Sequence, residues 1–377
     1  MAEAASLREL PFKSDVGMAE LSGAEYGVRS SEMAEVLGGE DLRTLSRLAS
    51  SGGMLPEGTD LATLAAGFAA FSVGATYSPL DKQVLLVDKF SGDSLLTHEF
   101  THALQDQHFD LMKMLLVRPY NFDRTEAAFA IVEGDATNVQ RRAEEGEAYG
   151  RRPLDEITRM EGDRFGDYRK EVGALFPPIL TETFIFRYRD GARFVETIRR
   201  RGGENAVNQL FTNPPVSSEQ ILHPEKYLQG EMARDVRVDE NAFAANGWTA
   251  TTSTPLGEIG IRGLLMIGIS EREAVNAAAG WNGDRAWLFE NTGHTPLFVW
   301  KTAWNKRADA EEFFKAYNRM LQRKSTPAEG GFTNGDASQA VWREANRVEI
   351  VRLTGDTVIV ARGSEQDAGG AVEMAQR

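Results

Sequence analysis

Two histidines and a glutamate lie in the stretch Leu95-Leu96-Thr97-His98-Glu99-Phe100-Thr101-His102-Ala103-Leu104, and their spacing is the most informative feature of this sequence. On a helix, side chains at positions i and i+4 lie one above the other, so His98 and His102 can bind one metal ion together. Glu99 lies one step round the helix, where it can reach a water molecule in an open coordination position. The H-E-x-x-H spacing therefore predicts a zinc site that has its own general base.

The residues around the motif predict a helix that follows two strands. Apolar residues recur at helical spacing over residues 95–104, which anchors the helix against a core. Residues 91–94 offer N-cap chemistry, and no proline or glycine interrupts the run from there to His108. Upstream, residues 73–78 and 83–88 predict two strands joined by a turn. Such a strand pair also offers a sheet edge that can hold an extended peptide.

A catalytic zinc ion needs three protein ligands, so the motif requires a third. His108 lies ten residues after His98, which is the spacing of the metzincin pattern. That pattern needs a glycine for a sharp turn, and Gln105 stands there instead, which is unfavourable at positive φ. Met112 and Met114 follow too closely to form the methionine turn of that class. His108 is therefore the weaker candidate.

Glu133 is the better candidate for the third ligand. It lies among small and apolar residues in a helix expected over roughly residues 122–147. A carboxylate in such a run needs a partner, and a metal ion is a good one. Glu126, seven residues earlier on the same face, is the alternative ligand. Asp135 is a candidate to orient one of the ligand histidines.

At this point the chain resembles the gluzincin metallopeptidases, in which a glutamate on a following helix completes H-E-x-x-H. Three segments are similar to those of a group of bacterial proteins of this type: residues 96–111, residues 133–137 (E-G-D-A-T) and residues 222–227 (L-H-P-E-K-Y). The likeness extends to residues 7–13. It implies zinc-dependent peptide hydrolysis, without a particular substrate. Thermolysin-like enzymes carry an aspartate four residues after the ligand glutamate, where this chain has Thr137, so the ligands must be supported differently.

The resemblance implies that His98, His102 and Glu133 bind one zinc ion per chain. Glu99 then takes the proton of the attacking water and delivers it to the leaving amine. A further donor must stabilise the oxyanion, and His223 and Tyr227 are the candidates. His223 reads equally well as a helix-cap or packing residue.

A second interpretation is a non-catalytic binding module in which zinc only joins two helices. Such a structural site is closed by four protein ligands, and His108 is the available fourth. An exopeptidase would need a group that captures a free substrate terminus, and the sequence contains no such motif. We therefore expect an endopeptidase whose partner is a peptide or protein substrate.

Composition limits the other function classes. The net charge of −14 opposes binding to nucleic acids or to anionic membranes. The chain contains no cysteine, which excludes disulfides and thiolate metal ligands. No stretch approaches the roughly 20 apolar residues that cross a bilayer, and residues 1–6 lack the apolar core of a signal peptide. Because many proteins of this type look exported, we slightly favour an exported protein whose leader precedes this chain over an intracellular one.

The expected fold class is α+β, in two domains, since 377 residues exceed one typical core. Residues 1–228 are expected to form a mainly helical, zincin-like catalytic domain with a small sheet. Residues 229–377 are expected to form a smaller α+β domain of unknown role. Within that second part we expect the following: irregular structure over 229–256, helices over 256–269 and 309–321, strands over 286–290 and 297–304, a polar loop over 325–339, and a hairpin over 348–353 and 357–361.

Overall fold

The computed structural model describes residues 1–72, 74–88, 92–173, 175–324, 338–344 and 346–376. The chain forms two compact units. The first unit comprises Met1–Gly39, Ala62–Phe176 and Thr183–Gly230, and the second comprises Glu40–Leu61, Pro177–Glu182 and Glu231–Arg377. Unlike the two domains expected from the sequence, the units are not continuous, because two short segments of the N-terminal half belong to the second unit.

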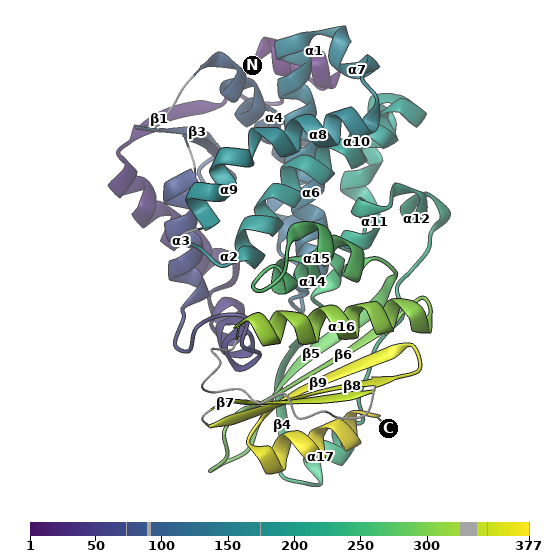
Figure 1. Ribbon diagram of the computed structural model, residues 1–377. Helices are drawn as coiled ribbons and strands as arrows, with labels where there is room; N and C mark the ends of the chain where they lie inside the picture. The colour runs from purple at the N-terminus through teal and green to yellow at the C-terminus, as the bar shows by residue number, and fades with distance from the viewer. Residues whose placement is uncertain (73, 89–91, 174, 325–337, 345, 377) are drawn as a thin grey trace. The chain divides into compact units, whose positions relative to one another are not determined.

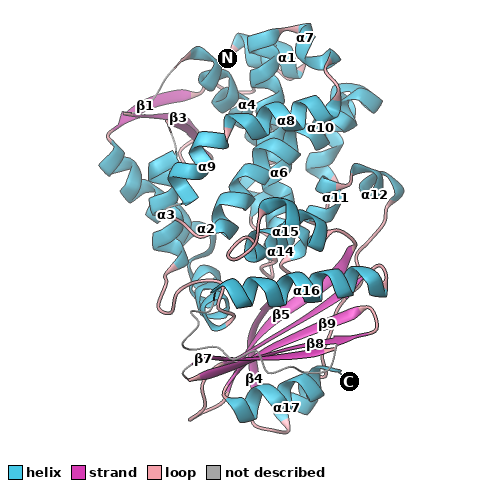
Figure 2. Cartoon of the chain, in the orientation of Figure 1, coloured by secondary structure: helices cyan, strands magenta, loops and turns pink. Residues whose placement is uncertain are grey.

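The fold class is α+β, as expected, and Figure 2 shows helices and strands in both units. Residues 1–230 contain these elements: α1 (Ala2–Arg8), β1 (Gly17–Leu21), α2 (Gly23–Ser51), α3 (Leu61–Ser72), β2 (Ala75–Ser78), β3 (Gln83–Val87), α4 (Asp93–Phe109), α5 (Leu111–Leu115), α6 (Phe122–Glu145), α7 (Glu147–Arg151), α8 (Leu154–Arg164), α9 (Gly166–Gly173), α10 (Pro178–Thr212), α11 (Ser218–Leu222) and α12 (Pro224–Gln229). The predicted motif helix is α4, and the predicted strand pair is β2 and β3, except that Val73 lies outside the described residues.

A three-stranded sheet supports α4 in the first unit. Its order is β1-β3-β2, with β1 parallel and β2 antiparallel to β3. Tyr77 and Val84 of the sheet form one apolar cluster with Phe100, Ala103 and Leu104 of α4. The apolar stripe expected on the motif helix therefore packs against the sheet, which fixes how the helix is rotated and where its histidines point.

Two glycines allow α6 and α10 to cross at close range. A Cβ atom on Gly134 of α6 would lie 2.2 Å from the backbone carbon of Gly191 in α10, and one on Gly191 would lie 2.2 Å from the carbonyl oxygen of Ala130. Because no Cβ fits at either position, both residues must be glycine. The small residues next to Glu133 thus permit the close helix approach that their size predicted.

The second unit is built on a six-stranded antiparallel sheet of order β4-β5-β6-β9-β8-β7. Its elements from residue 231 onward are α13 (Glu240–Ala244), β4 (Thr249–Thr254), α14 (Gly257–Leu265), α15 (Glu271–Ala278), β5 (Trp281–Glu290), β6 (Leu297–Trp304), α16 (Arg307–Lys324), β7 (Gln339–Glu344), β8 (Arg347–Thr354), β9 (Thr357–Gly363) and α17 (Glu365–Gln376). Figure 1 shows α16 and α17 on opposite faces of this sheet. Alternate residues accordingly enter two apolar clusters, with Leu288 and Trp300 in one and Trp287 and Val299 in the other.

The expected strands and helices of this part are present, and the hairpin corresponds to β8 and β9. The expectation of irregular structure over 229–256 was wrong in part, because α13 and β4 lie there. The expected polar loop over 325–339 falls mostly on residues outside the described part, and Gln339 begins β7. None of the described helices is long and apolar enough to span a membrane.

Candidate metal centre

Helix α4 carries both motif histidines on a buried face. His98 and His102 are 4% and 8% exposed, and their ring centroids lie 4.7 Å apart. The helix ends at Asp110, whose positive φ of 59° turns the chain and whose carboxylate caps α5 by accepting from the Lys113 amide. The sharp turn therefore comes at Asp110, after a full helical course through Gln105.

Glu133 of α6 completes the cluster. Its Oε2 atom lies 3.2 Å from His98 Nε2 and 3.4 Å from His102 Nε2. Two ligands that each lie about 2.1 Å from a tetrahedral zinc ion are about 3.4 Å apart. The two separations from Glu133 and the chemistry of the three side chains therefore suit a group that could hold a metal ion. Among the described residues they are the one group of three such side chains that can hold a metal ion.

The charges of the cluster are strongly coupled. Burial opposes ionisation of Glu133, but His102 and His98 hold the pKa of that carboxyl well below its usual range. Burial likewise disfavours the imidazolium of His102, while Glu133 and Glu99 favour it, and the net effect raises the pKa of His102 to about 9. Glu133 is thus an anion at neutral pH, as a metal ligand must be.

Glu99 is buried beside the three ligands and is held by the sheet. Its Oε2 atom accepts a hydrogen bond of 2.6 Å from the backbone amide of Tyr77 in β2. Burial raises the pKa of Glu99 above its ordinary value, and the negative charge of Glu133 adds to this effect, whereas the histidines and the Tyr77 amide oppose it. A carboxylate with a raised pKa binds a proton more readily than an exposed one, which suits a general base.

Gln105 orients His102. The Gln105 side-chain nitrogen donates to the Val132 carbonyl at 3.0 Å and to Asp135 Oδ2 at 2.9 Å, so its oxygen is the end that faces His102. That oxygen lies 2.9 Å from His102 Nδ1. Since an amide oxygen only accepts, Nδ1 must carry a proton. In neutral His102 this leaves Nε2, the atom near Glu133, unprotonated and able to bind a metal ion.

Asp135 therefore orients a ligand histidine indirectly, through Gln105. In the sequence, Gln105 stood out only because it replaces a metzincin glycine, and its amide function had no recognisable pattern. His98 has no equivalent support among the described residues, because its Nδ1 atom is buried without a hydrogen-bond partner there.

Tyr188 of α10 is the residue that the sequence analysis missed. Its ring stacks on His98 with centroids 6.0 Å apart and planes 20° apart. Burial raises the pKa of Tyr188 well above its ordinary value, and the charges of Glu133 and Glu99 raise it further. The hydroxyl is therefore protonated at neutral pH and can donate a hydrogen bond at this site. No motif marks it, because Tyr188 lies 90 residues after His98 (188 − 98), on another helix.

Glu126, the alternative ligand, has another role. Both of its carboxylate oxygens accept hydrogen bonds from Arg187, each at 2.8 Å, and the guanidinium also lies 4.2 Å from the ring centroid of Phe129. A carboxylate that is engaged at both oxygens by one guanidinium is satisfied without a metal ion. Of the two candidate acids of α6, Glu133 therefore lies in the cluster that could hold a metal ion, as preferred from the sequence, and Glu126 pairs with Arg187 instead.

The remaining candidates lie in other surroundings. His108 Nε2 is 2.8 Å from the carbonyl oxygen of Pro11, outside the ligand cluster. The Tyr227 hydroxyl donates to the carbonyl oxygen of Asn213 at 2.8 Å, and its ring packs against Phe194. His223 lies at the junction between α11 and α12. Tyr188, and not Tyr227, is the tyrosine whose ring lies against the cluster.

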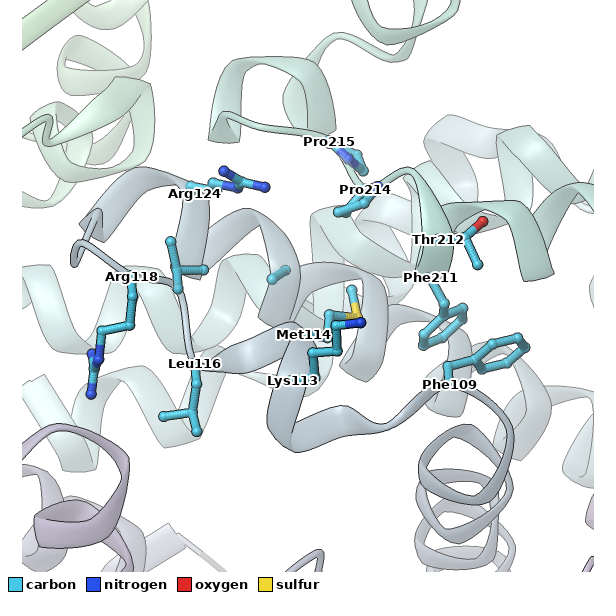
Figure 3. Close-up of a pocket in the computed structure, with 12 residues that line it drawn as sticks. Phe109, Lys113, Met114, Leu116, Arg118, Arg124, Phe211, Thr212, Pro214 and Pro215 are labelled. Carbon is cyan, nitrogen blue, oxygen red and sulfur yellow. The ribbon is translucent and has the colours of Figure 1, made fainter.

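A cavity of about 440 Å³ opens near the C-terminal end of α4, but it is not this site (Figure 3). Its lining combines apolar side chains with three exposed cations: Phe109, Lys113, Met114, Leu116, Val117, Arg118, Arg124, Ala128, Phe211, Thr212, Pro214 and Pro215. None of the three metal-facing residues is among them.

Comparison with known proteins adds one finding. A family model described as a domain of unknown function (DUF8575) matches residues 196–373. The match begins within α10, covers most of the second unit, and contains none of the residues of the metal centre. No curated protein and no solved structure matches the chain.

Proposed function

We propose that this chain is a zinc-dependent peptidase of the gluzincin type, with a zincin-like arrangement in its first unit. The observation that carries the proposal is the spacing of 3.2 and 3.4 Å between the Glu133 carboxylate and the two histidine Nε2 atoms. Those separations match a tetrahedral zinc ion with one position left for water. The buried Glu99 beside them is the acid that a hydrolytic site needs and a structural site does not.

The order of elements also supports the proposal. A sheet with an edge strand precedes the motif helix, and the helix that bears Glu133 follows it. The edge strand β2 reaches the centre through the bond from the Tyr77 amide to Glu99. An extended peptide that adds to this edge would pass beside the catalytic groups.

Each residue then has a defined task in the hydrolysis of a peptide bond. When bound by His98, His102 and Glu133, zinc would polarise the scissile carbonyl and make water a stronger nucleophile. Glu99 takes a proton from the attacking water and delivers it to the leaving nitrogen. Its raised pKa favours the first step and lets the carboxyl hold the proton until the leaving nitrogen takes it.

Tyr188 is our candidate for the oxyanion donor, in place of His223 and Tyr227. Its hydroxyl stays protonated because burial and two carboxylates oppose ionisation. Its ring is held against His98, so the donor is in place before the reaction begins. A pre-placed donor of this kind typically contributes about 10²–10³-fold to the rate of acyl-transfer reactions.

The alternative function, a structural zinc module, needs a fourth protein ligand. His108 is the residue that would supply it, and it bonds the Pro11 carbonyl instead. An ion pair between His102 and Glu133 without any metal is the other alternative. A simple ion pair would not explain why His98 and Glu99 are buried beside it, or why Gln105 orients the His102 ring. We therefore favour the catalytic site.

The test is the variant Glu99→Gln, measured for both zinc content and peptide hydrolysis. The amide retains the size of the side chain but cannot take a proton, so we expect one bound zinc per chain and a loss of about 10²–10⁴-fold in hydrolysis of a casein or peptide-library substrate.

Asp106→Asn is the matched control, because this acid also lies on α4 but bonds Tyr77 and Lys82 away from the ligands. It should retain both zinc and most of the activity. Loss of less than tenfold in Glu99→Gln would rule out catalysis by Glu99, and an inactive wild-type protein that binds zinc would favour the structural module.

A further inference from the structure

Arg8, on the first helix of the chain, is fully buried beneath the metal centre. Its guanidinium makes three charged or polar contacts: Nε donates to Asp135 Oδ2 at 2.9 Å, Nη1 to Glu204 Oε2 at 2.7 Å, and Nη2 to Asn208 Oδ1 at 2.8 Å. These partners lie on α6 and α10, the helices that provide Glu133 and Tyr188. Each of the three guanidinium nitrogens therefore donates one hydrogen bond to these helices.

A continuous chain of hydrogen bonds runs from Arg8 to a ligand histidine. Asp135 Oδ2 accepts from both Arg8 Nε and Gln105 Nε2, each at 2.9 Å. Gln105 then presents its oxygen to His102 Nδ1. The direction of every bond in this chain of hydrogen bonds follows from its two charged groups, because a guanidinium can only donate and a carboxylate can only accept. Asp135 must accept, Gln105 must donate to it, and His102 must carry its proton on Nδ1.

We propose that Arg8 is a positioning residue of the metal centre, which acts through Asp135 and Gln105 to hold His102 in its metal-binding tautomer. This inference rests on the proposed zinc site. Helix α1, which lies outside the H-E-x-x-H motif, then helps to position a ligand of that site through Arg8. Without Arg8 the Asp135 carboxylate loses the cation that holds it in place, and the Val132 carbonyl is left as the fixed acceptor that opposes a flip of the Gln105 amide. A flipped amide would present its nitrogen to His102 and favour the tautomer whose Nε2 is protonated and cannot bind zinc.

Other contacts hold the N-terminal segment in place independently of this chain. Glu3 accepts from the Thr97 hydroxyl at 3.1 Å, and the side-chain oxygen of Gln107 accepts from the Lys13 amide at 2.7 Å. Helix α1 would therefore remain docked on α4 when Arg8 is substituted. The effect of such a substitution on zinc can then be separated from loss of the whole segment.

The experiment measures the zinc dissociation constant of the full chain by competition with a chromophoric chelator, for the wild type, Arg8→Gln and Arg142→Gln. Arg142 is the matched control, because it pairs with the same Glu204 at 2.8 Å and bonds the Leu7 carbonyl, but does not contact Asp135. Substitutions behind metal ligands typically weaken binding about 10–100-fold. We expect a loss of that size in Arg8→Gln and less than about threefold in Arg142→Gln.

A double-substitution cycle tests whether Arg8 acts through Gln105. Gln105→Met removes the acceptor for His102 at nearly constant volume and should itself weaken zinc binding. If Arg8 acts through the hydrogen bonds to Gln105, Arg8→Gln causes no further loss of zinc affinity in the Gln105→Met background. A purely structural effect of Arg8 would add its full loss of affinity there. The nitrogen NMR signals of His102 in the zinc-free protein give a second readout, at a pH at which this imidazole is neutral: the proton should stay on Nδ1 in the wild type and lose that preference in Arg8→Gln.

Arg8→Lys decides the matter if Arg8→Gln does not fold, because it retains the buried charge but has one nitrogen for three partners. It should fold and still bind zinc at least about tenfold more weakly than the wild type. Equal zinc affinities for the Arg8 and Arg142 variants would overturn this inference and leave the zinc site intact. A wild-type chain that binds no zinc would overturn both.

Discussion

At the scale of single residues, the candidate metal centre is notable for how His102, one of its proposed ligands, is oriented. Thr137 stands where thermolysin-like enzymes have an aspartate, and the expected support is therefore missing at that position. Gln105 and Asp135 provide it for His102 by a different route, which starts at Arg8. The neutral Gln105 amide donates to Asp135 and accepts from His102, so it links the two without placing a charge next to the histidine.

Tyr188→Phe is the substitution that tests the oxyanion donor. It removes one hydroxyl and retains the ring that stacks on His98, so the Michaelis constant should change little. Because that hydroxyl interacts with the Glu133 side chain, zinc affinity should fall somewhat, but far less than turnover. The turnover number should fall about 10²-fold or more if the hydroxyl stabilises the transition state. Tyr168→Phe, in the same aromatic cluster, is the packing control. Steady-state kinetics that show equal turnover for the two variants would exclude Tyr188 from the reaction.

The sequence predicted the three residues that meet at the centre, because two of them form a local motif and the third follows on the next long helix. It did not predict Tyr188 or the role of Gln105. Their positions depend on how α4, α6 and α10 pack, and such packing leaves no pattern in the spacing of residues. His223 and Tyr227 were chosen from a family-like segment, and Tyr227 proved to be engaged by Asn213.

At the scale of elements, the crossing of α6 and α10 sets the geometry of the site. Glu133 is adjacent to Gly134, and Tyr188 lies three residues before Gly191, so both side chains are placed by the point at which the two glycines meet. Local propensity disfavours glycine within a helix by about 0.5–1 kcal/mol relative to alanine. The close approach provides the reason why it is nevertheless found at both positions.

Gly191→Ala should therefore destabilise the protein and weaken zinc binding together. Its methyl group would lie 2.2 Å from the Ala130 carbonyl oxygen, and relief requires the helices to separate. Overpacking of this kind typically costs about 1–3 kcal/mol of unfolding free energy. Gly67→Ala on α3 is the control, because a Cβ there has no neighbour within 4 Å, and it should be neutral or stabilising. Chemical denaturation and chelator competition measure the two effects. Wild-type behaviour of Gly191→Ala in both would show that the crossing is not tight.

Strands were predicted best where they are apolar and alternate. Such patterns are found in β2, β3, β5, β6, β8 and β9. The edge strand β4, by contrast, has the sequence Thr-Ala-Thr-Thr-Ser-Thr and pairs with a neighbouring strand on one side only. Its β-branched threonines fit a strand, but without apolar residues they resemble a loop. This explains why residues 229–256 appeared irregular.

At the scale of the whole molecule, the second unit contains segments from three parts of the chain. Leu48 and Met54, from residues 40–61, belong to the same apolar core as Trp300 and Trp304 of the sheet, and the Arg362 guanidinium donates to the Ser51 carbonyl at 3.0 Å. Pairing between segments so far apart is invisible to local sequence patterns. A single boundary near residue 228 was the simplest division that those patterns allowed.

The fragment 231–377 should therefore be much less stable than the same unit in the full chain. It lacks Leu48 and Met54, and removal of two such buried side chains typically costs about 2–5 kcal/mol each. We expect a lower melting temperature and binding of a hydrophobic dye. Addition of a synthetic peptide of residues 40–61 should restore part of the stability. A fragment that melts like the intact unit, with or without the peptide, would show that the core closes without this segment.

The central claim is tested most directly by zinc stoichiometry and affinity in three proteins: the wild type, Glu133→Ala and His108→Ala. We predict one tightly bound zinc ion per chain in the wild type and in His108→Ala, and at least about a 10²-fold loss of affinity in Glu133→Ala, because Glu133 completes the ligand set while His108 bonds Pro11. Unchanged binding in Glu133→Ala, together with loss of zinc in His108→Ala, would contradict the proposed centre.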